Sequence, residues 1–119
     1  MVCVYSLGNH LSDQRKERID FAPEGHTEDG LMVELILEKS DDGQVSLTGM
    51  EFIPTWVYKS GSSDNPNYYI LPLNDMETLL KETADLGIET EAKQSLARTN
   101  AIIGEGAAKI EAAFPIAAK

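Results

Sequence analysis

Polar side chains gather in the loop that follows the first apolar stretch of this 119-residue chain. The apolar stretch runs from Val2 to Tyr5, and Gly8 lies within the polar loop. Loops that extend from a buried strand are common places for binding and catalytic groups. Hydroxyl, amide, imidazole and carboxylate groups can hydrogen-bond a polar ligand or ligate a metal ion. We take five of them as candidate site-lining residues and assign none a catalytic role: Ser6, Asn9, His10, Asp13 and Gln14.

The amide and hydroxyl groups of this loop leave two interpretations open. An asparagine after a glycine, as at Asn9, is explained equally well by turn chemistry and by a ligand-binding group at the end of a strand. The hydroxyls of Ser6 and Ser12 lack the strand–turn–helix context that an activated serine nucleophile needs. We therefore expect no serine nucleophile in this loop, and both interpretations of Asn9 stay open.

Histidines and carboxylates are present, but their spacing does not predict a metal site. His10 and His26 lie sixteen positions apart, without the closely spaced histidine pairs of common zinc motifs. The carboxylates nearest to them in the sequence belong to Asp13, Glu24 and Asp29. We expect no complete metal site and no cofactor in this chain.

Composition excludes several classes of function. The net charge of −10 makes nucleic acid and other polyanions poor partners. No segment approaches the ~20 apolar residues that a membrane-spanning helix needs, and the N-terminus lacks the pattern of a signal peptide. One cysteine, Cys3, excludes a disulfide within the chain. Expressed alone, such a chain is expected to be cytoplasmic.

Two other groups of side chains have both a purely structural and a functional interpretation. The basic residues Arg15, Lys16 and Arg18 are expected on a solvated surface, with anion binding as the alternative. Four aromatic residues could stack on a sugar, although packing within the core or a hairpin explains them better. These aromatic residues are Trp56, Tyr58, Tyr68 and Tyr69.

The elements that must position the candidate loop are strands over the first part of the chain. Apolar residues alternate with polar ones from 31 to 38, which predicts a half-buried strand with Leu31, Val33, Leu35 and Leu37 on one face. A turn at 40–43 and a strand from 45 complete a hairpin, with a bulge near Gly49. The other expected segments are a strand at 2–7, an irregular segment at 8–29, an edge, bulge or change of sheet at Pro54, a loop at 61–67 and a strand at 68–71.

Helical periodicity replaces alternation after residue 74. The spacing of Met76, Leu79, Leu80 and Leu86 predicts a first helix that ends at Gly87. Thr90 is the expected N-cap of a longer helix, whose apolar stripe includes Ala92, Leu96, Thr99 and Ile103. The fold class is therefore α+β: an antiparallel β-hairpin sheet followed by C-terminal helices. We expect one domain over 1–119, mainly strands to residue 73 and mainly helices from 74.

Several segments follow one another in an order that is typical of a known family. The first is Tyr5–Asn9, which is followed by Ser12–Arg15. These two segments resemble a signature of the bacterial capsule-synthesis protein family, the CapA or poly-γ-glutamate biosynthesis proteins. Gly30–Leu35 is similar to the family's next strand, and Ile53–Val57 and Tyr69–Leu73 are similar to its later landmarks. The resemblance covers about residues 2–75. His10 departs from the pattern, because the family usually has phenylalanine there.

The resemblance implies a calcineurin-like metallophosphoesterase fold, in which a β-sandwich is flanked by helices. It implies a cell-surface or extracellular protein that serves the synthesis, export or anchoring of an anionic capsule polymer. The family's presumed metal ligands lie mostly upstream of the matched segments, so a divalent metal is expected only in a full-length member. We therefore expect this chain to be a non-catalytic C-terminal segment that self-associates through exposed strand edges. The alternatives are a metal-dependent hydrolase of phosphoester or γ-glutamyl polymer, completed by the upstream segment or a partner, and a module that binds anionic polymer.

Overall fold

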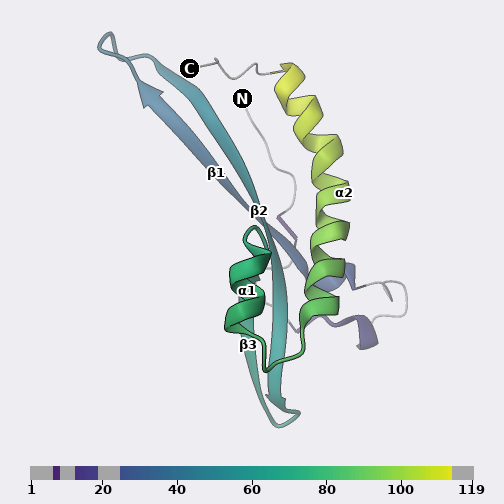
Figure 1. Ribbon diagram of the computed structural model, residues 1–119. Helices are drawn as coiled ribbons and strands as arrows, with labels where there is room; N and C mark the ends of the chain where they lie inside the picture. Colours follow the sequence, from purple (N-terminus) through teal and green to yellow (C-terminus); the bar gives the residue numbers. More distant parts are fainter. Residues whose placement is uncertain (1–6, 9–12, 19–24, 114–119) are drawn as a thin grey trace.

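The protein is seen in a computed structural model that describes residues 7–8, 13–18 and 25–113 (Figure 1). Over these residues the fold is α+β, as predicted, with a three-stranded antiparallel sheet of order β1-β2-β3 and two α-helices. Two short 3₁₀ turns precede the sheet. The elements in chain order are η1 Lys16–Arg18, η2 His26–Glu28, β1 Asp29–Lys39, β2 Val45–Ser62, β3 Asn65–Pro72, α1 Met76–Glu82 and α2 Glu89–Ala113.

The central strand, β2, has two different partners along its length. Strand β1 pairs with its first part, from Lys39↔Val45 to Asp29↔Trp56. Strand β3 pairs with its second part, from Thr55↔Pro72 to Ser62↔Asn65. The two ladders overlap only at Thr55 and Trp56. The sheet therefore has a three-stranded middle, and the far ends of β1 and β2 project from it as a two-stranded arm (Figure 1).

The expected irregularities of β2 occur where the sequence places them. The register shifts between Ile36 and Leu37, opposite Thr48, which confirms the bulge beside Gly49. Pro54 lies where the ladder with β3 ends, so its missing N–H deprives no strand of a hydrogen bond. Its carbonyl oxygen accepts from the backbone N–H of Leu73 at 2.8 Å. Pro54 thus marks the change of partner along one continuous strand.

Three predicted boundaries are wrong. The loop expected at 61–67 is a tight turn at Ser63 and Asp64, because the ladder extends to Ser62↔Asn65. Helix α1 ends at Glu82 instead of reaching Leu86, which is 44% exposed. Helix α2 begins at Glu89, and its first bond runs from the Ala92 N–H to the Ile88 carbonyl, so Thr90 is not the cap.

The hydrophobic core lies where the three-stranded part of the sheet meets α1 and the start of α2. Its buried members come from five different elements and loops, and they include the chain's one tryptophan. Tyr58, Leu71, Met76 and Leu96 pack around them. The predicted helical stripes contribute Leu79 and Ala92 to this cluster. The buried cluster is Trp56, Leu73, Leu79, Ile88 and Ala92.

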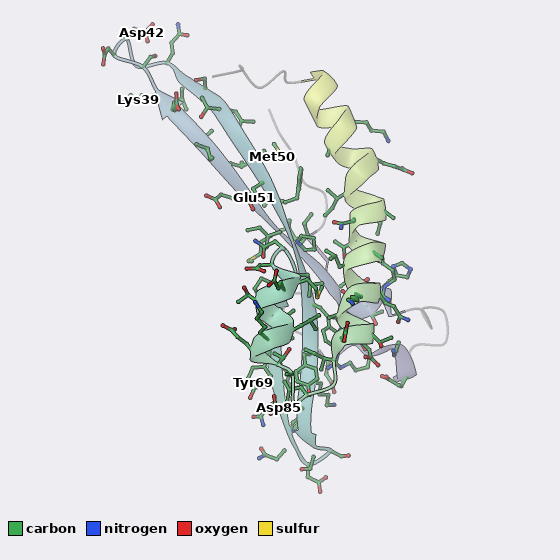
Figure 2. The ribbon with its side chains drawn as sticks, viewed as in Figure 1. Lys39, Asp42, Met50, Glu51, Tyr69 and Asp85 are labelled. Atoms are coloured by element: carbon green, nitrogen blue, oxygen red, sulfur yellow. The ribbon has the colours of Figure 1, made fainter. Side chains whose placement is uncertain are left out.

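The arm extends beyond this core. The predicted strand at 31–38 is confirmed, but its apolar face is only partly covered: Leu35 is 46% and Leu37 is 60% exposed. The radius of gyration is 17.2 Å, and the longest extent is 57 Å. A compact domain of this length has a radius of gyration of about 13.5 Å. The chain is therefore elongated, with apolar surface left open on the arm. Figure 2 shows the arm's side chains, with Lys39 and Asp42 at its tip.

The start of the chain meets the free edge of β1. Gly8 forms an antiparallel bridge with Gly30, and the Leu31 N–H donates to the Leu7 carbonyl oxygen at 2.7 Å. The rest of the strand expected at 2–7 lies outside the described residues. Among the described helices, none combines the length and the apolar character that crossing a bilayer requires.

The N-cap of α1 provides a test of the helix boundary. The Asp75 carboxylate accepts from the Thr78 N–H at 3.0 Å, and this hydrogen bond holds the pKa of Asp75 below 3.8. A depressed pKa stabilises the fold above the unfolded-state value, and this contribution is lost as the pH falls through the folded-state value. We expect Asp75→Ala to lower the melting temperature at neutral pH, with the difference closing below pH 3.8. Thermal unfolding followed by circular dichroism measures this.

Asp75→Asn is the matched control, because asparagine caps a helix without a titrating charge. Its melting temperature should exceed that of the alanine variant at every pH. A stability gap between wild type and Asp75→Ala that persists undiminished into strong acid would show that the carboxylate does not cap the helix.

Candidate functional site

Two consecutive carboxylates, Glu28 and Asp29, are buried at the junction of η2 and β1. Their exposed fractions are 6% and 9%. An unpaired buried carboxylate is strongly unfavourable, so each requires a compensating cation or several hydrogen bonds. Each meets a different arginine, and the two arginines come from opposite ends of the described chain.

Asp29 connects the sheet to α2. Its two carboxylate oxygens accept from Nε and Nη2 of Arg98 at 2.7 Å each, a bidentate arrangement. The Ser95 hydroxyl, which is fully buried, donates to the same carboxylate at 2.6 Å. Nδ1 of His26 lies 3.9 Å from it. Both oxygens of Asp29 are thus used to fix the helix against β1.

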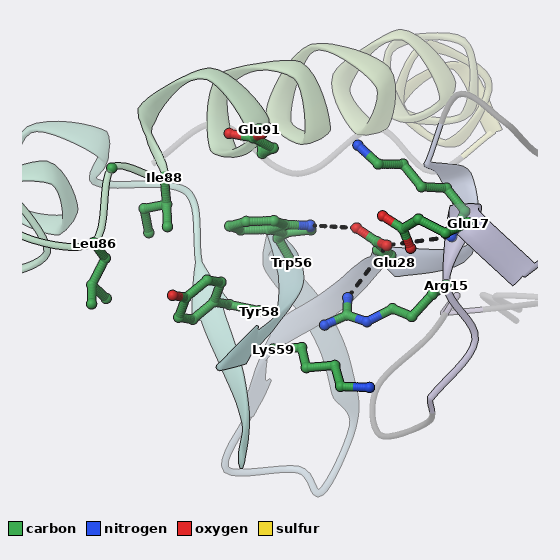
Figure 3. Close-up of a pocket in the computed structure, with 11 residues that line it drawn as sticks. Arg15, Glu17, Glu28, Trp56, Tyr58, Lys59, Leu86, Ile88 and Glu91 are labelled. Atoms are coloured by element: carbon green, nitrogen blue, oxygen red, sulfur yellow. Dashed lines mark hydrogen bonds and ion pairs between the residues drawn. The ribbon is translucent and has the colours of Figure 1, made fainter. Parts of the chain in front are cut away.

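Glu28 connects the segment 13–18 to β2. One carboxylate oxygen accepts from Trp56 Nε1 at 3.2 Å, and the other lies 3.4 Å from Arg15 Nη1 (Figure 3). The Lys16 backbone N–H donates to it at 3.4 Å. Arg15 Nη1 also donates to the Val57 carbonyl at 2.7 Å. Arg15 is only 7% exposed, so the arginine is consumed by these contacts.

This second network forms one wall of a cleft of about 490 Å³ (Figure 3). A volume of this size is typical of small-ligand sites. Segment 15–17, the Trp56–Lys59 part of β2 and the start of α2 line it. Two of its cations are already neutralised, since Arg15 faces Glu28 and Lys59 Nζ lies 3.1 Å from Asp13. The remaining charged lining residues are Lys16, Glu17 and Glu91.

The structure describes two of the five candidate residues predicted from the sequence. Asp13 and Gln14 are both exposed, and Asp13 lies beside Lys59 with Arg15 Nε 4.0 Å away. Ser6, Asn9 and His10 lie outside the described residues. Asp13 is thereby placed near the cleft as an ion-pair partner. The basic surface expected at 15–18 is corrected in one respect, because Arg15 is buried.

The four aromatic residues differ in whether they pack at the core. Trp56 belongs to the core, and its ring centroid lies 5.6 Å from that of Tyr58, which pairs in turn with Tyr69 at 6.3 Å. Tyr68 lies under two cations, with Arg15 at 5.9 Å and Lys59 at 5.4 Å from the ring centre. Packing therefore explains Trp56 and Tyr58, as the sequence predicts.

Among the described residues, no three His, Cys, Asp or Glu side chains gather in a way that could hold a metal ion. Asp29, one of the carboxylates near His26 in the sequence, is engaged by Arg98 and Ser95. A metal at Asp29 would have to displace a guanidinium from a bidentate contact. The described residues therefore do not fit a metal centre.

Sequence reasoning missed both carboxylate networks. Ser95 and Arg98 lie three residues apart on the stripe that also carries Ala92 and Thr99. A serine and an arginine on an otherwise apolar stripe were the signal that a buried acid faces the helix. Nothing local identifies Asp29 as that acid, since it lies 66 and 69 residues away from them in the chain.

No protein-family model matches the chain, and the comparisons with curated proteins and with solved structures returned no match.

Removal of one partner of the Asp29–Arg98 pair should strongly destabilise the fold. The two side chains are 10% and 18% exposed, so removing one partner leaves the other charge largely buried. We expect Asp29→Ala or Arg98→Met to lower the free energy of unfolding by about 3 kcal/mol. The double variant should lose less than the sum of the two single losses, by at least about 1 kcal/mol. Urea unfolding of the four proteins measures this.

The exposed pair Glu89 and Lys93, on the same helix, provides the control. Alanine at either position should change the free energy of unfolding by less than about 0.5 kcal/mol. Additive losses at Asp29 and Arg98 would contradict a coupled pair.

Proposed function

We propose that this chain is the C-terminal, non-catalytic part of a capsule-biosynthesis protein of the CapA type, which serves an anionic polymer such as poly-γ-glutamate. Support comes first from the resemblance, whose landmark segments occur in the family's order. It comes also from where those segments lie. Gly8 pairs with Gly30, Gly30 with Thr55 and Thr55 with Pro72, in one row across the sheet.

This row carries the proposal. Each of its four residues belongs to or adjoins a different landmark segment, and as many as 64 positions separate them in the chain. Such a row is the arrangement expected where the landmark segments form neighbouring strands of one sheet. The Leu73 N–H and the Pro54 carbonyl join the last two landmarks directly. Gly8, which directly precedes the candidate residue Asn9 in the sequence, lies at the edge of the sheet in this row.

The proposed architecture is one layer of a calcineurin-like β-sandwich at the cell surface. The open apolar face of the arm supports it, since such a face needs a second layer (Figure 2). A divalent metal belongs to the complete family fold. The described residues do not fit a metal centre, so no catalytic step is assigned to them.

Loss of the gene and assays of the purified chain test this function together. We expect a deletion strain to lose surface-bound anionic polymer and to regain it with the wild-type gene. With added Mn²⁺, the purified chain should hydrolyse neither a phosphodiester nor a γ-glutamyl anilide above the buffer rate. Unchanged capsule in the deletion strain would overturn the capsule role. Turnover that Asn9→Ala abolishes, or a stoichiometric bound metal, would favour the hydrolase instead.

The cleft beside Trp56 favours a second candidate, an anionic-polymer module, because Arg15, Lys16 and Lys59 all line it. Neutralisation of Arg15 and Lys59 and the net charge of −10 oppose this. We therefore expect the emission of Trp56, the only tryptophan, to stay unchanged when poly-γ-glutamate is added.

Fluorescence titration at low and high salt checks this expectation. Quenching that weakens with salt and disappears in Lys16→Glu would establish the binding module. Lys93→Glu, at an exposed position on α2 outside the cleft lining, is the control for a change of net charge alone.

A further inference from the structure

One face of the arm is apolar from Leu31 to Leu37. Cross-strand partners share a face of a sheet, so the register sorts the side chains of β1 and β2 into two sets. The rungs of the apolar face are Leu31–Pro54, Val33–Phe52, Leu35–Met50 and Leu37–Leu47, with Lys39–Val45 at the tip. The rungs of the opposite face are Met32–Ile53, Glu34–Glu51, Ile36–Gly49 and Glu38–Ser46.

Charge is segregated between the two faces. The apolar face has no charged side chain before Lys39 at the tip, whereas the opposite face carries Glu34, Glu38 and Glu51. This is unusual in a chain with 20 acidic residues. Covering the apolar face would bury no carboxylate, so its desolvation would be favourable along its length.

The apolar face is exposed where the third strand and the helices leave it. Leu37 is 60% and Val45 is 62% exposed, and Leu35 is 46% exposed. A two-stranded ribbon without cover is marginally stable in water. The arm therefore gains most from a partner that covers this face.

The face continues into a hollow at the base of the arm. Leu31, its first member, lines an apolar hollow of about 280 Å³ together with Thr99, Ile102 and Ile103 of α2. Ile102 is 67% exposed. Figure 1 shows α2 and the arm diverging above this point. The open surface thus spans the arm, the hollow and the neighbouring face of α2.

We infer that a second copy of this chain covers this surface, with the apolar faces of the two arms packed against each other. The inference rests on the two-layer architecture proposed above and names the second layer. An uncharged apolar face is complementary to itself, as a two-fold interface requires. The acidic residues of the opposite faces would remain in water on both sides of the resulting sandwich, where the net charge of −10 per copy costs least.

The area predicts a weak dimer. Over nine positions of β1, from 31 to 39, the two strands of the arm present a face of about 30 by 10 Å. Standard stable interfaces bury about 800 Å² per partner. The arm alone provides less than this, and the hollow and Ile102 extend it. The dimer should therefore form in a concentration-dependent way. Because the copies repel each other, added salt should strengthen it.

Light scattering coupled to size-exclusion chromatography, from micromolar to millimolar concentration, tests the inference. We expect the mass to rise from 13.0 kDa towards twice that value. Leu37→Glu should weaken the dimer at least about tenfold, because it would place a carboxylate in the apolar interface. Ile36→Glu is the matched control: the neighbouring residue, 49% exposed, lies on the opposite face, and its substitution should leave the dimer intact. Circular dichroism verifies that both variants fold.

Three outcomes would overturn the inference. A wild-type mass of 13.0 kDa at every concentration would show that no second copy binds. Equal effects of Leu37→Glu and Ile36→Glu on dimer formation would indicate pairing through the strand edges. Neither substitution changes the backbone groups at those edges, so neither face would then be distinguished. A dimer that dissociates in high salt would indicate charge pairing instead. None of these results bears on the capsule role, which the deletion strain tests separately.

Discussion

Two neighbouring carboxylates hold this molecule together. Glu28 binds Arg15 and the indole of Trp56, while Asp29 binds Arg98 and Ser95. The chain has a small buried apolar cluster, so packing alone specifies the docking of its segments weakly. Two buried ion pairs with directional hydrogen bonds add what packing lacks, namely a unique position for segment 13–18 and for α2. Such pairs gain little net stability when intact, but each excludes alternative arrangements that would leave a charge buried and unpaired.

The position of the Asp29 contact also explains the open arm. It holds α2 through Ser95 and Arg98, which lie in the first half of a helix that runs to Ala113. A long helix fixed near one end continues straight, whereas the twisted arm bends away from it (Figure 1). The two elements diverge along the arm (Figure 1), and Leu35 and Leu37 on the arm's apolar face remain 46% and 60% exposed. The contact of Asp29 with α2 thus influences the exposure of apolar side chains about 30 Å farther along the arm.

Local pattern predicts the parts of this fold that local physics determines. Alternation at 31–38 identifies β1, Gly49 marks the bulge, and Asp75 precedes the first helix, each from a few adjacent residues. The prediction of a loop at 61–67 is wrong because cross-strand pairing continues to Ser62 and Asn65 despite residues that favour turns. The extent of burial on the apolar face of the arm could not be predicted in the same way. Alternation shows which side chains share a face, but a separate element must cover that face to bury it. The carboxylate networks join residues up to 69 positions apart, and no local rule selects such partners.

Gly8 brings the chain against β1 beside Asp29, the residue that binds Arg98 of α2. Its φ of +74° is unfavourable for any other residue, and a Cβ there would lie 2.6 Å from the Asp29 carbonyl oxygen. The glycine is thus required for the chain to approach β1 directly at Asp29, beside the anchor of α2. The described part of this segment, Leu7 and Gly8, is joined to β1 by the Gly8–Gly30 bridge and by the hydrogen bond from the Leu31 N–H to the Leu7 carbonyl oxygen. A side chain at position 8 would push the chain away from β1, so both the bridge to Gly30 and the Leu31–Leu7 hydrogen bond depend on this glycine.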